Sequence, residues 1–105
     1  MEKLQYISQG QTLTEQKNNI LKALDAGAKW IQIRWKDADE KSRYLLAEQI
    51  KQTCSEFGAS CIINDHPLLA AAVDADGVHL GLDDCSVTAA RDILGAGKII
   101  GGTAN

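Results

Sequence analysis

Ile62-Ile63-Asn64-Asp65 is a short apolar run that ends in an amide and a carboxylate, and the pattern returns at Asp76-Gly77-Val78-His79-Leu80-Gly81-Leu82-Asp83-Asp84. Apolar runs of this length predict buried parallel strands, because a strand covered on both faces does not need to alternate with polar residues. Open α/β sheets and (β/α) barrels place their chemistry at the carboxyl ends of such strands. Two carboxylates at neighbouring strand ends therefore suggest a site for a hard metal ion.

The composition predicts one modest globular domain over residues 1–105, with 45% hydrophobic residues and a net charge of -3. The acidic balance and the lack of a basic run argue against nucleic-acid binding. No stretch approaches the roughly 20 apolar residues of a membrane span, and Met1 is not followed by the apolar core of a signal peptide. Three cysteines without zinc-like spacing suit reduced thiols. We therefore expect a cytoplasmic protein that does not bind membranes.

Strands and helices are expected to alternate along the whole chain. The sequence predicts strands at residues 4–8, 30–34, 60–64, 77–80 and 98–102. Helices are expected from an N-cap at Thr12 or Thr14 to Gly27, from residue 39 to 57, from 67 to 73, and from an N-cap at Ser86 to Leu94. The predicted order is βαβαβαβαβ.

This alternation implies a parallel sheet with right-handed crossovers, because parallel neighbours cannot be joined by a tight hairpin. Two architectures are compatible with it: an open doubly wound sheet, which the length favours, or the first five strands of an eight-stranded barrel. In residues 30–34, Gln32 and Arg34 alternate with Ile31 and Ile33, so the polar side of this strand is expected to line a barrel interior.

A basic cluster follows the second predicted strand. Gln32, Arg34 and Lys36 project the same way from an extended chain and offer one amide and two cations, which could hold a diphosphate. The simpler interpretation is a solvated strand end. Both interpretations stay open on the spacing alone.

An acidic cluster follows the third and fourth predicted strands. Mg²⁺ binds through one or two carboxylates together with substrate phosphates, so Asn64-Asp65 and Asp83-Asp84 could join a metal to the basic cluster. The alternatives are a helix N-cap for Asp65 and a turn or N-cap for Asp83-Asp84. His79 is expected to face the same interior or to be a packed strand residue. Thr103 could bring a hydroxyl to an anion, although Gly101-Gly102 before it is also a simple loop signal.

Four blocks taken in order resemble thiamine phosphate synthase: Gln32-Ile33-Arg34-Trp35-Lys36, Ile63-Asn64-Asp65, residues 77–84, and Lys98-Ile99-Ile100-Gly101. The resemblance implies a (β/α)8 barrel and a transferase. That family joins an aminopyrimidine methyl diphosphate to a thiazole phosphate, with Mg²⁺, and releases thiamine phosphate and pyrophosphate. The implied mechanism is dissociative: the diphosphate leaves first, the thiazole nitrogen attacks the resulting cation, and no side chain acts as a nucleophile.

The resemblance also implies a role for each candidate residue. By position, the diphosphate contacts would come from Arg34, Lys36 and Asn64, Mg²⁺ ligation from Asp65 and Asp84, pyrimidine contacts from Gln32 and His79, and a place near the reacting groups would fall to Thr103. The chain departs from the family at Trp35, where an acidic residue is common, at Leu82-Asp83 in place of Gln-Glu, and at Asn105 in place of histidine.

Barrels of this kind run from about 200 residues upward, so the chain of 105 residues is expected to be an incomplete barrel, with strands in the order 1-2-3-4-5. We expect the chain alone to be weakly active or inactive, and exposed sheet edges to favour self-association. Two alternatives are a thiazole tautomerase-like barrel and a non-catalytic Mg²⁺-binding receiver-like module. The tautomerase branch shares the barrel but not the diphosphate chemistry, so the presence of Arg34, Lys36, Asn64, Asp65 and Asp84 argues against it. The receiver would show strand order 2-1-3-4-5 and an acidic pair after its first strand, which residues 4–9 lack.

Overall fold

The structure, a computed structural model, describes residues 5–81 and 87–102. One parallel sheet holds strands β1 (Gln5–Ile7), β2 (Trp30–Ile33), β3 (Ser60–Asn64), β4 (Gly77–Leu80) and β5 (Ile99–Gly102), in the order β1-β2-β3-β4-β5. Helices α1 (Leu13–Asp25), α2 (Glu40–Phe57), α3 (Pro67–Ala72) and α4 (Val87–Leu94) connect successive strands. The predicted alternation and the strand order 1-2-3-4-5 are confirmed.

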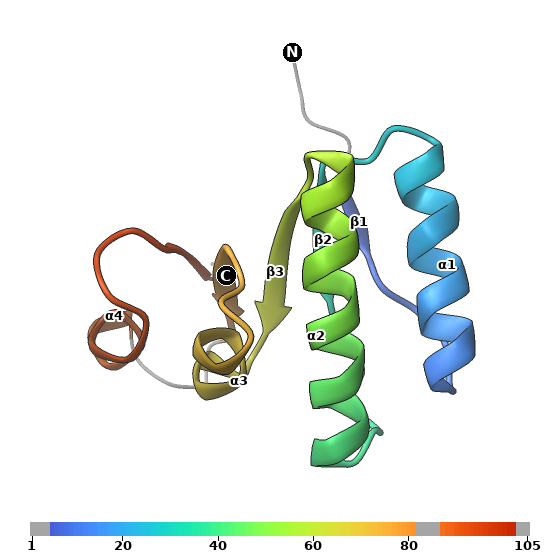
Figure 1. The fold of residues 1–105 in the computed structure, drawn as a ribbon. Coiled ribbons are helices and arrows are strands. Elements are labelled where there is room, and N and C mark those ends of the chain that lie inside the picture. The colour runs from blue at the N-terminus through green and yellow to red at the C-terminus, as the bar shows by residue number, and fades with distance from the viewer. Residues whose placement is uncertain (1–4, 82–86, 103–105) are drawn as a thin grey trace.

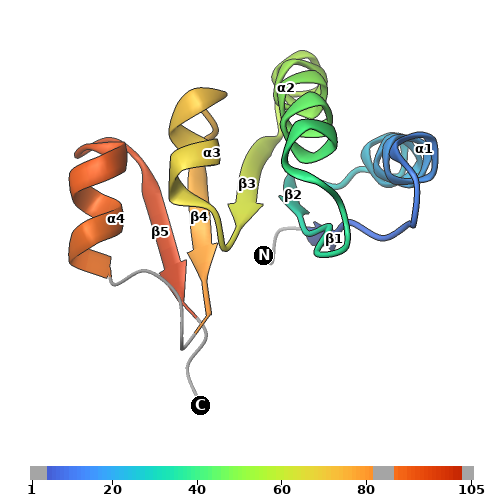
Figure 2. The same cartoon turned by 90° about the horizontal axis from the view of Figure 1, so that it is seen from below.

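The helices lie on one side of the sheet, and the strands follow one another around the other side (Figures 1 and 2). The open doubly wound sheet that the chain length favoured is wrong, because such a sheet carries helices on both faces and changes direction at a switch point. The order 2-1-3-4-5 of a receiver-like module is not observed either. The architecture is that of five consecutive strands of a (β/α) barrel wall with the four helices that connect them.

Local capping signals explain where the two long helices begin and end. The Thr12 hydroxyl accepts a hydrogen bond from the Glu15 amide at 3.1 Å at the start of α1. The Asp39 carboxylate accepts one from the Ser42 amide at 2.8 Å at the start of α2. Gly58 adopts a left-handed conformation with φ of 68° and ends α2, as expected for a residue without a Cβ.

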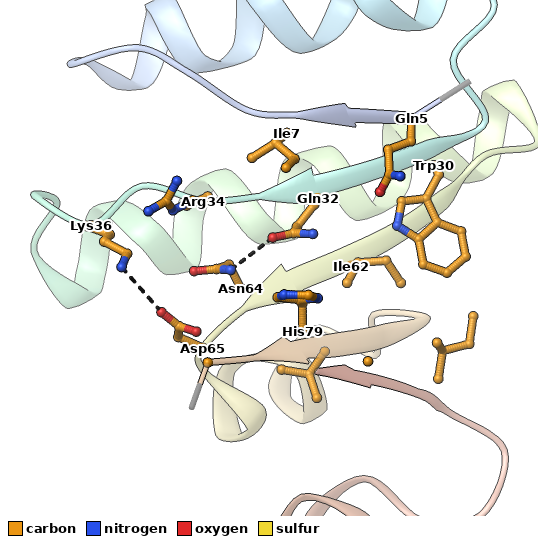
Figure 3. A pocket seen from close by; sticks show the side chains of 14 residues that line it. Gln5, Ile7, Trp30, Gln32, Arg34, Lys36, Ile62, Asn64, Asp65 and His79 are labelled. Atoms are coloured by element: carbon orange, nitrogen blue, oxygen red, sulfur yellow. Dashed lines mark hydrogen bonds and ion pairs between the residues drawn. The ribbon is translucent and has the colours of Figure 1, made fainter. Parts of the chain in front are cut away.

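The hydrophobic core lies between the helices and the convex side of the sheet. Ile31 and Ile33 of β2 are 0% and 2% exposed and belong to this core, while Gln32 between them faces the concave side (Figure 3). The two-residue period therefore separates an apolar face from a polar one, as predicted. Further core residues come from α1, α2, β3 and β4: Ile20, Leu24, Leu46, Ile50, Ile63 and Val78.

Several strand and helix ends differ from the predicted ones by one or two residues. The second strand ends at Ile33, because the Arg34 amide donates to the Ser8 hydroxyl at 2.8 Å instead of to a strand carbonyl. The fifth strand begins at Ile99, because the Lys98 carbonyl accepts from the Arg91 guanidinium at 2.7 Å. The predicted N-cap Ser86 lies outside the described residues. Within the described ranges, none of the helices combines the length and the apolar character that crossing a bilayer requires.

Candidate functional site

A pocket of about 610 Å³ opens on the concave side of the sheet, toward the carboxyl ends of the strands (Figure 3). The strand-end rule predicts chemistry at this place. Each sequence-predicted site residue that the structure describes lines the pocket: Gln32, Arg34, Lys36, Asn64, Asp65 and His79. The basic cluster and one half of the acidic cluster therefore share a single cavity.

Lys36 and Asp65 face one another across the mouth of this pocket. The Lys36 ammonium lies 3.8 Å from an Asp65 carboxylate oxygen, and the two side chains are 61% and 19% exposed (Figure 3). Solvent weakens an ion pair with this exposure, so it contributes little to stability. Its importance is spatial, because it places a cation from the end of β2 opposite an acid from the end of β3.

Gln32 and Asn64 meet deeper in the pocket. The Asn64 side-chain nitrogen donates to the Gln32 side-chain oxygen at 2.9 Å, between the adjacent strands β2 and β3 (Figure 3). The bond fixes which way both amides point, and it leaves the Gln32 nitrogen, the second N–H of Asn64 and the Asn64 oxygen able to bond a ligand. The pocket wall thus offers both donors and an acceptor at defined places.

Arg34 is positioned by its backbone. Its amide donates to the Ser8 hydroxyl at 2.8 Å, and the same hydroxyl donates back to the Arg34 carbonyl at 3.3 Å. Ser8 is 3% exposed, so this reciprocal pair is shielded from water. The Arg34 guanidinium, in contrast, has no hydrogen-bond or ion-pair partner within residues 5–81 and 87–102, and it remains available to an anion.

Asp65 marks a sharp turn between β3 and α3. Its φ is 69°, in the left-handed region that Asp tolerates better than most residues. Its amide donates to the His79 carbonyl at 2.8 Å, which continues the pairing of β3 with β4. The alternative role of Asp65 as the N-cap of α3 is wrong, because His66 holds that position without a side-chain capping bond. At this turn the Asp65 side chain points to the pocket instead.

His79 lies on the pocket side of β4, as expected, next to Gly101 of β5. A Cβ on Gly101 would lie 3.5 Å from the His79 Nδ1 atom, in ordinary van der Waals contact, so the imidazole lies beside this glycine. Asp84 and Thr103 lie outside the described residues, and their predicted roles stay predictions.

The oxygen atoms of the described pocket residues suit one part of a magnesium site. Asp65 supplies a carboxylate, and Asn64 beside it supplies an amide oxygen that the Gln32 bond leaves open. Within the described ranges, no three His, Cys, Asp or Glu side chains gather closely enough to enclose a metal ion. Mg²⁺ does not need such an enclosure, because it keeps several waters and binds through one or two carboxylates and the phosphates of its substrate. The residues present therefore fit this ion.

Three contributors to the site were not found from the sequence. Trp30 was not among the predicted site residues, yet it lines the amino-terminal end of the pocket (Figure 3). The two-residue alternation with Gln32 could have placed it there. Ser8 holds Arg34, and Arg43 contacts the segment after β2. Neither has a sequence signal, because both act on backbone atoms.

The fold and the sequence both match known proteins. The family profile described as thiamine monophosphate synthase matches residues 4–105. A thiamine-phosphate synthase of Flavobacterium johnsoniae is 58% identical over 103 residues, which cover 98% of this chain and 49% of the relative. One from Flavobacterium psychrophilum is 56% identical, with 98% and 50% covered.

A solved structure, a thiamine phosphate pyrophosphorylase from Pyrococcus furiosus, superimposes with a TM-score of 0.87 at 34% identity and covers 95% of this chain and 48% of its own. The chain thus spans about half the length of the relatives it matches. These relatives are synthases, so they give no support to the tautomerase and receiver alternatives. The chain belongs to the thiamine monophosphate synthase family.

Proposed function

We propose that this chain forms the diphosphate-binding part of a thiamine phosphate synthase, a transferase of thiamine biosynthesis. The observation that carries the proposal is the pair Lys36 and Asp65, 3.8 Å apart across the mouth of a pocket that Arg34 also lines. The pocket volume of about 610 Å³ lies within the roughly 300–1,000 Å³ usual for small-molecule sites. Family membership supports the choice of substrate.

In the proposed complex, the diphosphate of an aminopyrimidine methyl diphosphate lies between the basic and acidic clusters. Arg34 and Lys36 contact its oxygens, because a guanidinium and an ammonium both form charge-assisted hydrogen bonds to phosphate. Asp65 and Asp84 would hold Mg²⁺, which supplies charge neutralisation for the diphosphate when it is bound. Asn64 adds a hydrogen bond through the second N–H of its side-chain amide, which the bond to Gln32 leaves open.

The pyrimidine ring then occupies the deeper part of the pocket. Gln32 of β2 and His79 of β4 line the pocket on either side of β3 and would offer hydrogen bonds to ring nitrogens and the amino group. Ile62 and Trp30 line the same part and would cover the apolar surface of the ring. Thr103 is assigned a place near the reacting groups by family position.

The residues of this chain suit a reaction in which the leaving group departs first. The bond between the methylene carbon and the diphosphate oxygen breaks, and the electron pair leaves with the diphosphate. Arg34 and Lys36 stabilise the charge that develops on it. The nitrogen of the thiazole phosphate then forms the new bond to carbon. No nucleophilic side chain takes part.

The second substrate requires more than the described site. In (β/α)8 barrels a phosphate site is frequently built by the loops after strands seven and eight, whereas this chain contains five strands in its described residues. We therefore expect the 105-residue chain to bind the diphosphate substrate and to show weak or no turnover by itself.

Titration calorimetry with the aminopyrimidine methyl diphosphate tests the proposal, with and without Mg²⁺. Asp65→Asn removes one carboxylate charge from the site and keeps a side chain that tolerates φ of 69°. Asp74→Asn is the matched control, because Asp74 also has a positive φ, of 54°, and also pairs with a lysine, Lys98, at 2.6 Å. It precedes β4 and so lies at the opposite end of the strands.

We expect Mg²⁺-dependent binding to the unchanged chain and to Asp74→Asn, and a loss of the Mg²⁺ dependence in Asp65→Asn. Binding that Asp65→Asn leaves unchanged would remove this residue from the site. Absence of any binding to the unchanged chain would refute the proposed function of these residues.

A further inference from the structure

Arg43 donates several hydrogen bonds to the segment that carries Lys36. It lies in the first turn of α2, and its Nη2 atom donates to the carbonyl oxygens of Trp35 at 3.0 Å, Lys36 at 3.2 Å and Ala38 at 2.9 Å. Its Nε atom donates to the Trp35 carbonyl at 3.2 Å as well. One half-buried guanidinium thus binds three carbonyls of a segment of four residues.

These carbonyls belong to a part of the chain that is neither strand nor helix. Residues 34–39 lie between the last residue of β2 and the first of α2, so the sheet and the helix give their backbone little support. The Ser8 hydroxyl fixes the beginning of the segment at Arg34. The Asp39 carboxylate binds Ser42 at its end. Arg43 is the contact that holds the middle, where Lys36 lies.

We propose that Arg43 is a positioning residue of the diphosphate site: its guanidinium holds the backbone of residues 35–38 so that the Lys36 ammonium faces Asp65 across the pocket. This inference rests on the proposed function. Without the contact, Lys36 would have to be ordered when the anion binds. Ordering a segment at the moment of binding costs free energy, so a backbone that is already held in place favours binding.

The shape of the arginine side chain, as well as its charge, is required for this role. A guanidinium carries five N–H donors in a rigid planar fork, so it can bond several carbonyls at once. A lysine at the same position would keep the positive charge and a nitrogen with three N–H donors, but it has no second nitrogen to replace Nε at the Trp35 carbonyl and no rigid plane to fix the direction of its bonds. Arg43→Lys therefore separates positioning from simple attraction of an anion.

Arg91 offers a matched control for Arg43. Its Nη1 atom donates to the carbonyl oxygens of Gly95 at 2.9 Å and Lys98 at 2.7 Å, in the turn between α4 and β5. The contact is of the same kind, but this turn precedes β5 and lies at the amino ends of the strands, away from the pocket mouth. Arg91→Met removes an equivalent clamp and the same charge.

The test measures binding of inorganic pyrophosphate with Mg²⁺ by calorimetry, and hydrogen exchange of residues 34–39 by mass spectrometry without ligand. The proteins are the unchanged chain, Arg43→Met, Arg43→Lys and Arg91→Met, at a temperature at which circular dichroism shows each to be folded. We expect both Arg43 variants to exchange faster in this segment and to bind pyrophosphate roughly tenfold more weakly. Arg91→Met should bind within about twofold of the unchanged chain, because its clamp is remote from the anion.

Each result decides between distinct explanations. Full binding by Arg43→Lys would show that the charge suffices and would overturn the positioning role. Unchanged binding or unchanged local exchange in Arg43→Met would overturn it too. An unchanged chain that does not bind pyrophosphate would refute the proposed function, and this role with it. If the unchanged chain and both Arg43 variants bind pyrophosphate equally well, the positioning role of Arg43 is refuted and the proposed function is not.

Discussion

The side chains of Asn64 and Gln32 form a hydrogen bond of 2.9 Å that connects β3 to β2 inside the pocket. Gln32 is 5% exposed, so water cannot easily replace a lost partner. Gln32→Met should destabilise the fold by about 1 kcal/mol, because it leaves the Asn64 amide without this acceptor. Urea denaturation measures the loss. Adding Asn64→Leu to Gln32→Met should recover part of the lost free energy of unfolding. If the loss in the double variant equals the sum of the losses in the two single variants, the two amides do not act as a pair.

Gly77 is required for the close approach of β4 to β5. A Cβ at this position would lie 2.7 Å from the Ile99 Cβ and would overlap the Ile99 carbonyl oxygen. We expect Gly77→Ala to lower the free energy of unfolding by about 1–3 kcal/mol, as overpacking does. Gly97→Ala is the control, because a Cβ there meets nothing within 4 Å. Similar denaturation midpoints for the two variants would contradict this explanation.

The N-cap of α2 makes stability depend on pH. Hydrogen bonds from Ser42 hold the pKa of Asp39 below the ordinary aspartate value of 3.8. A carboxylate whose pKa is lower in the folded state stabilises the fold above the unfolded pKa, and this contribution disappears as the pH falls through the folded value. The unchanged chain should therefore lose more stability below pH 3.8 than Asp39→Asn, which keeps a capping oxygen that does not titrate. The measurement is the urea midpoint of each protein as a function of pH. A constant difference between the two midpoints from neutral pH down to acid pH would contradict this explanation.

Lys36 and Lys98 each pair with an aspartate, but only Lys36 lines the pocket. Lys36→Met should weaken the binding of inorganic pyrophosphate roughly tenfold or more, because it removes a charge-assisted contact. Lys98→Met changes the net charge equally and should have little effect. Calorimetry at constant ionic strength compares the two. Equal weakening would mean that the anion responds to total charge instead of to the pocket.

The outer edge of β5 and the concave face leave apolar side chains uncovered. Ile99 is 41% exposed, and within the described ranges β5 pairs with β4 alone. Exposed strand edges favour association, so the 105-residue chain is expected to self-associate at high concentration. Ile99→Lys should reduce this association. Leu68→Lys, on α3 and away from the edge, should not. Sedimentation velocity measures both, and an equal response would exclude the edge as the cause.

Local signals in the sequence predicted the elements accurately where the deciding residues lie next to one another. The strands at residues 60–64 and 77–80 have the predicted bounds, and α2 begins after Asp39 and ends before Gly58. The side of the sheet that the helices cover could not be predicted from the chain length, because length does not determine how the strands curve. For that reason the prediction of an open doubly wound sheet, which rested on length, was wrong.

The candidate site was predicted where it depends on strand geometry. Alternation placed Gln32 and Arg34 on the pocket side, and the strand-end rule placed Asn64 and Asp65 at the carboxyl end of a strand that lines the pocket. Ser8 was not predictable, because its bonds to Arg34 cross 26 residues of sequence and involve only backbone atoms of the partner.

The sheet presents its strands in the order in which they are synthesised. Domains generally begin to fold from the amino-terminal side during translation. Each strand that leaves the ribosome after the first therefore meets a neighbour that is already present, and the helix before it can cover the growing sheet at once. The nascent chain can build this half of the barrel wall by successive addition, without waiting for a distant segment to be translated.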